Sequence, residues 1–246
     1  MRFRLLTAYV SFLLLSVSAV TAAPLARAMS ADATRTWRST KQIAISPAHA
    51  NSGDWHWAGR LGSAVLLTSL TDRSLRADAE DWDRFAHRDL ARLGKSYQRI
   101  EVTGGAALLA YGAGLALDKP TWRRTGTEIA QAWSVASAGT FAVKTLLGRA
   151  RPEKDRGPYH VIGPNLRDGY HSFPSGDVTE AFALSSVLAA EIKSWPVRVG
   201  LYALAATTAF QRIEADRHWG SDVVGAAVWG TVVGWGVVKV NQRLKD

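Results

Sequence analysis

The sequence contains no cysteine and only two methionines among its 246 residues. The absence of cysteine excludes disulfide bonds, thiol nucleophiles and cysteine-ligated metals. Acidic residues are also scarce relative to basic ones, with 21 Asp and Glu against 30 Lys and Arg, which leaves a formal charge of +9. This excess of cations indicates an anionic partner, either a nucleic acid, a membrane surface or a phosphorylated substrate. Because 47% of the residues are hydrophobic, the chain has enough apolar surface to form a folded core.

Long hydrophobic runs are scarce as well. Beyond the N-terminus no uncharged run exceeds 16 residues, whereas a membrane-spanning helix needs about 20. The runs are rich in Ala, Leu, Val and Gly, so we predict that they are helices of an all-α bundle, periplasmic or peripheral to a membrane. They cover residues 61–71, 102–117, 129–143, 181–190, 199–211 and 223–238. Glycines expected to allow close helix packing are Gly104, Gly105, Gly112 and Gly114 in one run and Gly225, Gly230, Gly234 and Gly236 in another.

The N-terminus has the order of a secretory signal. Arg2 and Arg4 precede an uncharged run of residues 5–26, which has an apolar centre and then small residues. We predict a signal peptide over residues 1–23, with an uncleaved anchor helix as the alternative. Either interpretation places the rest of the chain outside the cytoplasm, in the periplasm or on a membrane facing it. Nucleic acid is then excluded as the anionic partner.

Two further segments follow the signal. Residues 24–95 are predicted to form an N-terminal arm with cap helices, in which 24–55 are irregular. Acidic side chains between residues 72 and 99 alternate with arginines and lack metal-ligand spacing, so we interpret them as a solvated helix face. Residues 96–246 are predicted to form the catalytic bundle. Within it, residues 148–174 are rich in Gly and Pro and form a long loop, which in a compact domain is usually functional.

Three clusters of polar residues flank this loop. They are Lys144-x6-Arg151-Pro152, Phe173-Pro174-Ser175-Gly176-Asp177 and Arg212-x5-His218-x3-Asp222. Lysine and arginine side chains suit phosphate oxygens, and a helix that begins near Ser175 and Gly176 would add backbone N–H donors. His218 and Asp222 are four residues apart and would share a helix face, where a carboxylate orients an imidazole.

Each cluster also has a purely structural interpretation. Lys144, with Arg149 or Arg151, could cap a helix C-terminus. The pair of His218 and Asp222 could be structural, and Arg212 could form an ion pair with Glu214 at the edge of the core. The three clusters together, in this order around one loop, are more specific than any of them alone.

The clusters resemble the signature of the type 2 phosphatidic acid phosphatase and vanadium haloperoxidase superfamily. That signature runs Lys-x6-Arg-Pro, Pro-Ser-Gly-His and Ser-Arg-x5-His-x3-Asp. The resemblance implies an all-α helical bundle of the acid phosphatase and haloperoxidase type. It implies that His218 attacks phosphorus, that Asp222 orients it, and that no metal or cofactor is needed. The residues implied to bind the phosphate are Lys144, Arg151, Ser175, Gly176 and Arg212.

Two positions depart from the family pattern. Gln211 replaces a serine, and Asp177 replaces the histidine that protonates the leaving oxygen in the family. Three interpretations of Asp177 remain open. It could cap a helix with Glu180, it could be buried and protonated so that it acts as the acid, or His171 or His160 could supply the proton instead.

The expected function is that of an exported phosphatase acting on a phosphate or diphosphate ester, with a phosphorylated lipid or a small ester as substrate. A weakened acid favours diphosphates, because phosphate leaves more easily than an alkoxide. One alternative is a catalytically weakened relative that binds phosphate or lipid headgroups. Another is a vanadate-dependent haloperoxidase that uses the same cationic site. The sequence does not indicate an oligomeric state.

Overall fold

The computed structural model describes residues 2–82 and 87–244, with side chains from residue 24 onward except at residue 47. Every long element in this part of the chain is a helix, which confirms the all-α prediction. The helices are α1 (Arg2–Ile45), α2 (Ser52–Ser69), α3 (Asp72–Glu80), α4 (Arg88–Tyr97), α5 (Ile100–Ala116), α6 (Pro120–Leu147), α7 (Gly176–Glu191), α8 (Trp195–Glu214) and α9 (Gly220–Arg243). Each predicted helical run falls within one of these elements, apart from one or two residues at an end.

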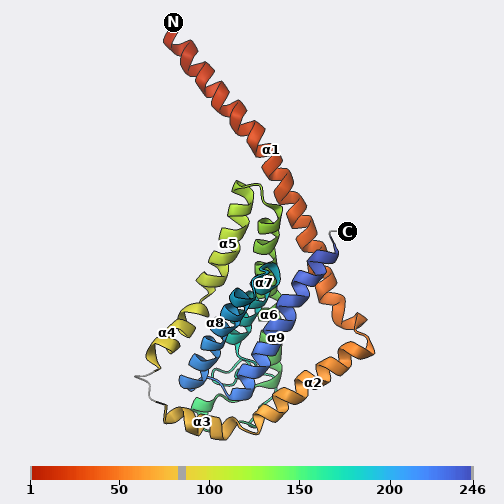
Figure 1. The fold of residues 1–246 in the computed structure, drawn as a ribbon, viewed down its shortest axis with the longest axis vertical. Coiled ribbons are helices and arrows are strands. Elements are labelled where there is room, and N and C mark those ends of the chain that lie inside the picture. Colours follow the sequence, from red (N-terminus) through yellow and green to blue (C-terminus); the bar gives the residue numbers. More distant parts are fainter. Residues whose placement is uncertain (1, 83–86, 245–246) are drawn as a thin grey trace.

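Helix α7 is the centre of the bundle, with α6, α8 and α9 packed around it (Figure 1). Small and branched apolar side chains fill the core, including Ala132 and Ala136 of α6, Val187 of α7 and Val237 of α9. Gly230 and Gly234 face α7 closely, because a Cβ atom at Gly230 would lie 2.3 Å from the carbonyl oxygen of Thr179. The close approach predicted for these two glycines is therefore confirmed.

Four of the other glycines do not serve close packing. Cβ atoms placed at Gly104, Gly105, Gly112 and Gly236 would meet nothing within 4 Å. The prediction was wrong for these positions, because spacing alone does not tell which face of a helix meets a neighbour. Gly114 and Gly225 do lie against other groups, near Arg123 and the ring of Phe173.

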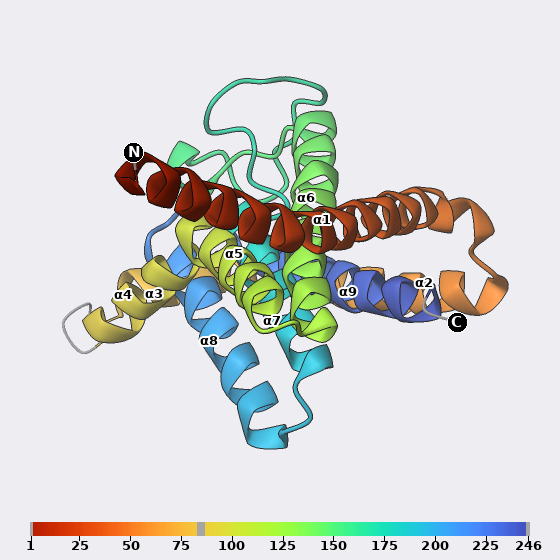
Figure 2. The same ribbon diagram turned by 90° about the horizontal axis from the view of Figure 1, so that it is seen from above.

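The prediction of an irregular segment over residues 24–55 was also wrong. Residues 24–45 continue α1, residues Ser46–His49 form a short 3-10 helix, and α2 begins at Ser52. Polar side chains of α1 make the contacts that hold it to the bundle, since Asp32 pairs with Arg123 of α6 at 2.9 Å. The amide of Gln131 donates to hydroxyls of Ser39 and Thr40. Viewed from above, α1 crosses over the bundle (Figure 2).

The directions of the helices bring several helix ends together at one end of the bundle. From α5 to α9, consecutive helices run in alternate directions, so α6 and α8 end where α7 and α9 begin (Figure 1). The connection between α6 and α7, residues 148–175, lies at this end and contains one short 3-10 helix, Pro152–Lys154. Two of its glycines, Gly148 and Gly169, have positive φ angles of 62° and 79°, a conformation that glycine adopts at least cost. The long loop predicted from Gly and Pro content is confirmed.

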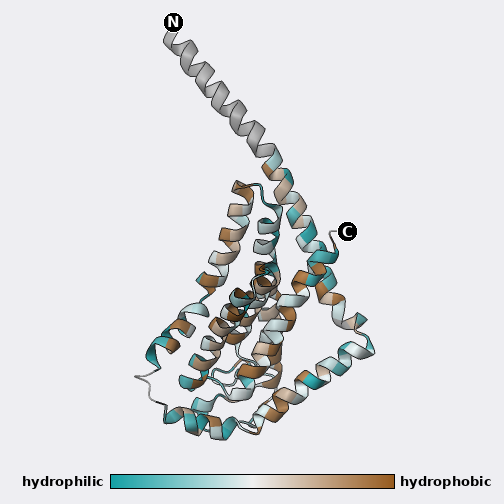
Figure 3. Cartoon of the chain, viewed as in Figure 1, coloured by the Kyte–Doolittle hydropathy of each residue, from teal (hydrophilic) through white to brown (hydrophobic). Residues whose placement is uncertain are grey.

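Hydrophobic residues occur along several helices (Figure 3), and some of the large ones are exposed. Leu108 and Leu109 of α5 are 74% and 75% exposed, and Leu66 of α2 and Phe141 of α6 are also exposed. Among the described helices, α9 is long and apolar enough to cross a membrane by length and composition, although 44% of its most apolar window is buried inside the bundle. Helix α9 thus extends beyond the 16-residue run that the sequence suggested.

Candidate phosphate site

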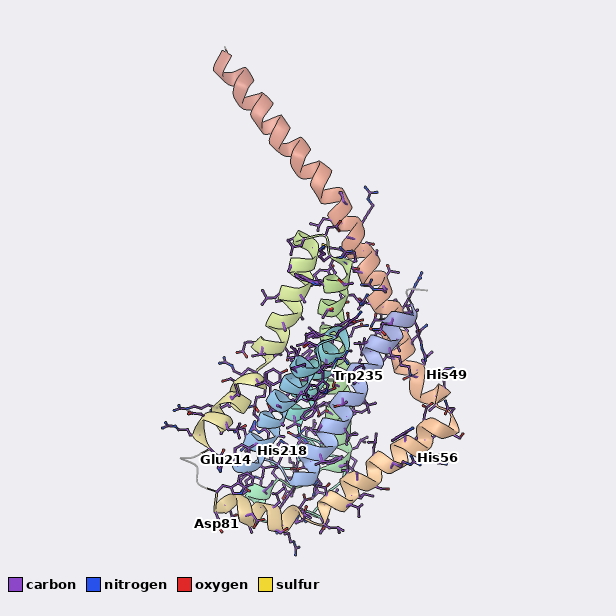
Figure 4. All side chains as sticks on the ribbon, in the orientation of Figure 1. His49, His56, Asp81, Glu214, His218 and Trp235 are labelled. Atoms are coloured by element: carbon purple, nitrogen blue, oxygen red, sulfur yellow. The ribbon has the colours of Figure 1, made fainter. Side chains whose placement is uncertain are left out.

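The three sequence clusters meet at the end of the bundle that carries the loop. Lys144 lies in the last turn of α6, Ser175 and Gly176 begin α7, and Arg212 lies in the last turn of α8. His218 precedes α9, and Figure 4 shows it between α8 and α9, far from His49 and His56 at the corner of α1 and α2. Residues separated by almost 80 positions are brought together because the helices that carry them run in alternate directions, which places the ends of α6 and α8 beside the starts of α7 and α9.

The N-termini of α7 and α9 are joined directly. The backbone N–H of Ser175 donates to the carbonyl oxygen of Asp222 at 3.2 Å. Ser175 is the N-cap of α7 and is fully buried. A Cβ atom at Gly176 would lie 3.8 Å from Cε of Lys144, which places the lysine beside the start of α7. The backbone N–H groups in the first turn of α7 therefore lie beside the positive charge of Lys144. Together they form an arrangement that can bind an anion.

Several polar atoms of these residues are buried without a hydrogen-bond partner. Among the described side chains they include Nε of Arg151, Oγ of Ser175, Nε of Arg212 and Nδ1 of His218. A buried polar atom without a partner costs about 1–3 kcal/mol, so native proteins rarely keep several in one place without a purpose. Three of these four atoms are donors that would match the oxygens of a phosphate group.

Lys144 is the most perturbed cation of the set. Burial, and then the neighbouring charge of Arg151, lowers its pKa from 10.5 to about 8. Its Nζ donates to the neutral carbonyl oxygen of His171 at 2.6 Å. Among the described residues it forms no ion pair, so a bound anion would gain an unpaired positive charge here.

His218 and Asp222 form a pair, although not in the way that their spacing suggested. His218 is not on a helix with Asp222, because α9 begins only at Gly220. Its Nδ1 nevertheless lies 3.6 Å from Oδ2 of Asp222, too far for a hydrogen bond but within ion-pair distance. Burial lowers the pKa of His218, and the Asp222 carboxylate opposes that effect. The imidazole is therefore neutral and available as a nucleophile at neutral pH.

Asp222 is fully buried and heavily hydrogen-bonded. Its Oδ2 accepts from Oγ of Ser172 at 2.6 Å and from the N–H of Trp219 at 2.9 Å. Arg149 donates to its Oδ1. Burial alone would raise the pKa of Asp222, but His218, Arg149 and Ser172 outweigh burial and hold the pKa below its usual value. The carboxylate is thus fixed both in position and in charge.

Arg149 is a residue whose place in the site the sequence did not reveal. We considered it only as a possible helix cap, yet its side chain is buried and bridges Asp222 and Asp72. Asp72 was also misassigned, because it belongs to the stretch that we interpreted as a solvated helix face but is 1% exposed. The alternation of charges in that stretch gave no signal that one aspartate pairs with an arginine 77 residues away.

Asp177 pairs with one of the site's own cations. Its Oδ2 accepts from Nη1 of Arg212 at 2.7 Å. The capping interpretation was wrong, because Ser175 is the N-cap of α7 and Asp177 lies in the first turn. The interpretation as a buried, protonated acid also loses its premise, since the Asp177 side chain is 40% exposed and ion-paired.

The two loop histidines make contacts of their own. Nε2 of His171 lies 3.0 Å from the carbonyl oxygen of Asn165, and the ring of His160 packs near the ring of Tyr170. The idea that one of them supplies the proton remains a prediction. Likewise, Arg212 pairs with Asp177 rather than with Glu214.

Three comparisons relate this chain to known proteins. A search of curated protein sequences found no match. The solved structure of the transmembrane PAP2-type phosphatidylglycerolphosphate phosphatase from Bacillus subtilis is similar over 73% of this chain and 96% of that one, at 19% identity and a TM-score of 0.42. The sequence model of the PAP2 superfamily matches residues 128–246, which include every predicted site residue. Over residues 128–246, the chain is therefore similar to the PAP2 superfamily.

Proposed function

We propose that this protein is a phosphatase that hydrolyses a lipid-linked phosphate or diphosphate through a phosphohistidine intermediate. The observation that carries the proposal is the group of buried donors without partners on Arg151, Ser175 and Arg212, together with Lys144, around a histidine whose Nδ1 lies 3.6 Å from a buried carboxylate. Such preorganised cations and N–H groups stabilise the charge of a transferring phosphoryl group. The similarity of residues 128–246 to the PAP2 superfamily supports the same reaction class.

The proposed reaction uses the chain's own residues. Nε2 of His218 attacks phosphorus, the bond to the leaving oxygen breaks, and a phosphohistidine forms. Asp222 holds Nδ1 and stabilises the positive charge that develops on the ring. Water then attacks the phosphohistidine, which returns phosphate and neutral His218. The roles of the phosphate-binding residues are to position the phosphoryl group and offset its charge.

The contact between Asp177 and Arg212 supports a diphosphate as the preferred substrate. The side chain at the position of the family's acid is an ion-paired carboxylate, and therefore a poor proton donor. An alkoxide, whose conjugate acid is about as weak as water, needs a strong acid to leave. A phosphate monoester, with a second pKa of about 6, leaves without one.

Exposed apolar side chains support a lipid substrate. Leu108 and Leu109 of α5 and Phe141 of α6 lie on outer faces, and α9 is apolar enough to span a bilayer. We extend the proposal to a membrane-associated protein whose site faces the periplasm, with residues 1–23 as a signal or anchor. Flotation with lipid vesicles tests the association, and protein that stays at the bottom of the gradient would contradict it.

A phosphate-release screen tests the proposed reaction. The substrates are matched lipid mono- and diphosphates, nucleotides and an aryl phosphate, with His218→Ala as the blank. We expect kcat/KM to be higher on the diphosphate, and labelled substrate to leave an acid-labile, base-stable phosphoenzyme that His218→Ala lacks. Equal or better rates on the monophosphate would contradict the diphosphate preference. Phosphate binding without any turnover would instead establish the non-catalytic alternative.

The departure at Asp177 has its own test. We expect Asp177→His to keep or raise the monoesterase activity, because it restores the group that protonates a leaving oxygen. A large loss in a folded variant would show that the aspartate has a specific role of its own.

A further inference from the structure

Asp72 lies outside the family-matched region but contacts the site directly. It is the first residue of α3, 56 residues before the matched region begins at residue 128. Its carboxylate is buried, although it belongs to a helix whose other acidic residues are exposed. A buried carboxylate is costly unless charged and polar partners surround it.

The partners of Asp72 come from both sides of the site. Its Oδ1 accepts the backbone N–H of Ser221 at 2.8 Å. Its Oδ2 accepts Oγ of Ser221 at 2.7 Å and Nη2 of Arg149 at 2.7 Å. Asp72 therefore holds the first turn of α9, which carries Asp222, and the arginine that contacts Asp222.

Arg149 links the two carboxylates. One end of its guanidinium contacts Asp72, and the other contacts Asp222 and Oγ of Ser221. Its Nε donates to the carbonyl oxygen of Pro158 at 2.7 Å. The three ionic side chains are all less than one-tenth exposed, so solvent screens them little. Two carboxylates share one guanidinium, which leaves a net charge of −1 beside His218.

Helix α3 is itself fixed to this end of the bundle. Arg76, one turn after Asp72, donates to both carboxylate oxygens of Asp216 at 2.9 Å and to Asp155 at 2.8 Å. The same guanidinium lies 5.7 Å from the ring centre of Trp219. Asp72 is thus carried by a docked helix and not by a mobile segment.

We propose that Asp72 is a positioning residue that acts through Arg149 on Asp222 and His218. Its charge offsets that of Arg149, so that Asp222 keeps its negative charge 3.6 Å from Nδ1 of His218. That charge favours the Nδ1–H tautomer and leaves Nε2 free to attack phosphorus. Without this charge, Arg149 would neutralise Asp222 alone and weaken its hold on the imidazole. The kinetic part of this inference rests on the proposed phosphatase function, whereas the state of the His218 ring does not.

The charges around His218 determine the expected sign of the change. Removing the negative charge of Asp72 makes protonation of the imidazole less favourable, because cations dominate the remainder of the site. The charged groups that face the histidine and its partners come from five helices and one loop: Asp72 of α3, Lys144 of α6, Arg149 and Arg151 of the loop, Asp177 of α7, Arg212 of α8 and Asp222 of α9.

The test compares Asp72→Asn with Asp78→Asn, an exposed aspartate on the same helix. Ring ¹⁵N chemical shifts of His218, assigned by difference from His218→Ala, report the tautomer without requiring turnover. We expect the wild type and Asp78→Asn to hold the Nδ1–H tautomer, and Asp72→Asn to lose part of it. We also expect kcat to fall at least about tenfold, as when the outer partner of a functional imidazole is removed. The acidic limb of kcat/KM should move to lower pH.

The outcomes separate the two proposals. A folded Asp72→Asn protein with the wild-type tautomer of His218 would overturn the positioning role, whatever its activity. An inactive wild type that shows the expected change of tautomer would overturn the phosphatase function and leave the positioning role standing. Should Asp72→Asn not fold, Asp72→Glu decides, because it keeps the charge and moves the carboxylate. We then expect a lower kcat with an unmoved acidic limb, and a wild-type kcat would overturn the inference.

Discussion

The pKa of Lys144 makes a quantitative prediction about the pH dependence of catalysis. With a pKa of about 8, about nine-tenths of the side chain is charged at pH 7 and about one-tenth at pH 9. In the proposed mechanism, this positive charge binds and stabilises the phosphoryl group. We therefore expect kcat/KM to fall about tenfold between pH 7 and pH 9. The substrate does not contribute to this change, because its phosphate has a second pKa of about 6 and is already ionised.

The physical cause is burial, so the effect should depend on a lysine at this position. Arginine keeps its charge above pH 12. We expect Lys144→Arg to lose the alkaline limb between pH 7 and pH 10, even if its kcat/KM at pH 7 is lower. Lys193→Arg, at an exposed lysine, serves as the matched control and should keep the limb.

The measurement is kcat/KM across this pH range on the best substrate of the screen, with circular dichroism to confirm that each variant stays folded. A flat profile in the wild type would refute the lowered pKa. An alkaline limb that persists in Lys144→Arg would assign the titration to another group.

Three further predictions concern packing, the Asp177 contact and the support of Asp222. Gly230→Ala should lower the free energy of unfolding by about 1–3 kcal/mol, because its Cβ would clash with α7. Gly236→Ala, on the same helix but with open space beside it, should raise the free energy of unfolding by about 0.5–1 kcal/mol. Denaturant unfolding that gives the two variants the same stability would contradict this. Asp177→Asn should tighten inhibition by inorganic phosphate about fivefold, because it frees the guanidinium of Arg212 from its ion pair. Weaker inhibition by phosphate would count against this prediction. Ser172→Ala should lower kcat with little change in KM, because it removes a buried hydrogen bond to Asp222, the carboxylate proposed to orient His218. A change in KM alone would argue against this role of Ser172.

Much of the fold was predictable from local features of the sequence. Long runs of Ala, Leu and Val without strand punctuation identified the helices, and the spacing of Gly230 and Gly234 identified one close helix contact. Residues 24–45 were not predicted as a helix because their surface is polar. Their helix docks through contacts such as those of Asp32 and Gln131, which hydrophobic patterning does not detect.

The candidate site was predictable only in part. The signature's spacing identified Lys144, Ser175, Arg212 and His218. The structure then shows that the helices bring these residues to one end of the bundle. Local spacing was misleading for Asp177, which lies in the first turn of α7 and not at its cap.

The sequence alone determined the all-α class and the flanking loop, because helix formation and loop composition depend on neighbouring residues. The residues proposed to bind and transfer a phosphoryl group came from its resemblance to a known signature. Only the tertiary structure decided how those groups are charged and held. The docking of α3 buries Asp72 against Arg149, and the end of α8 brings Arg212 to Asp177. Such pairs join residues 77 and 35 positions apart, and their energies depend on burial, which exists only once the helices have packed.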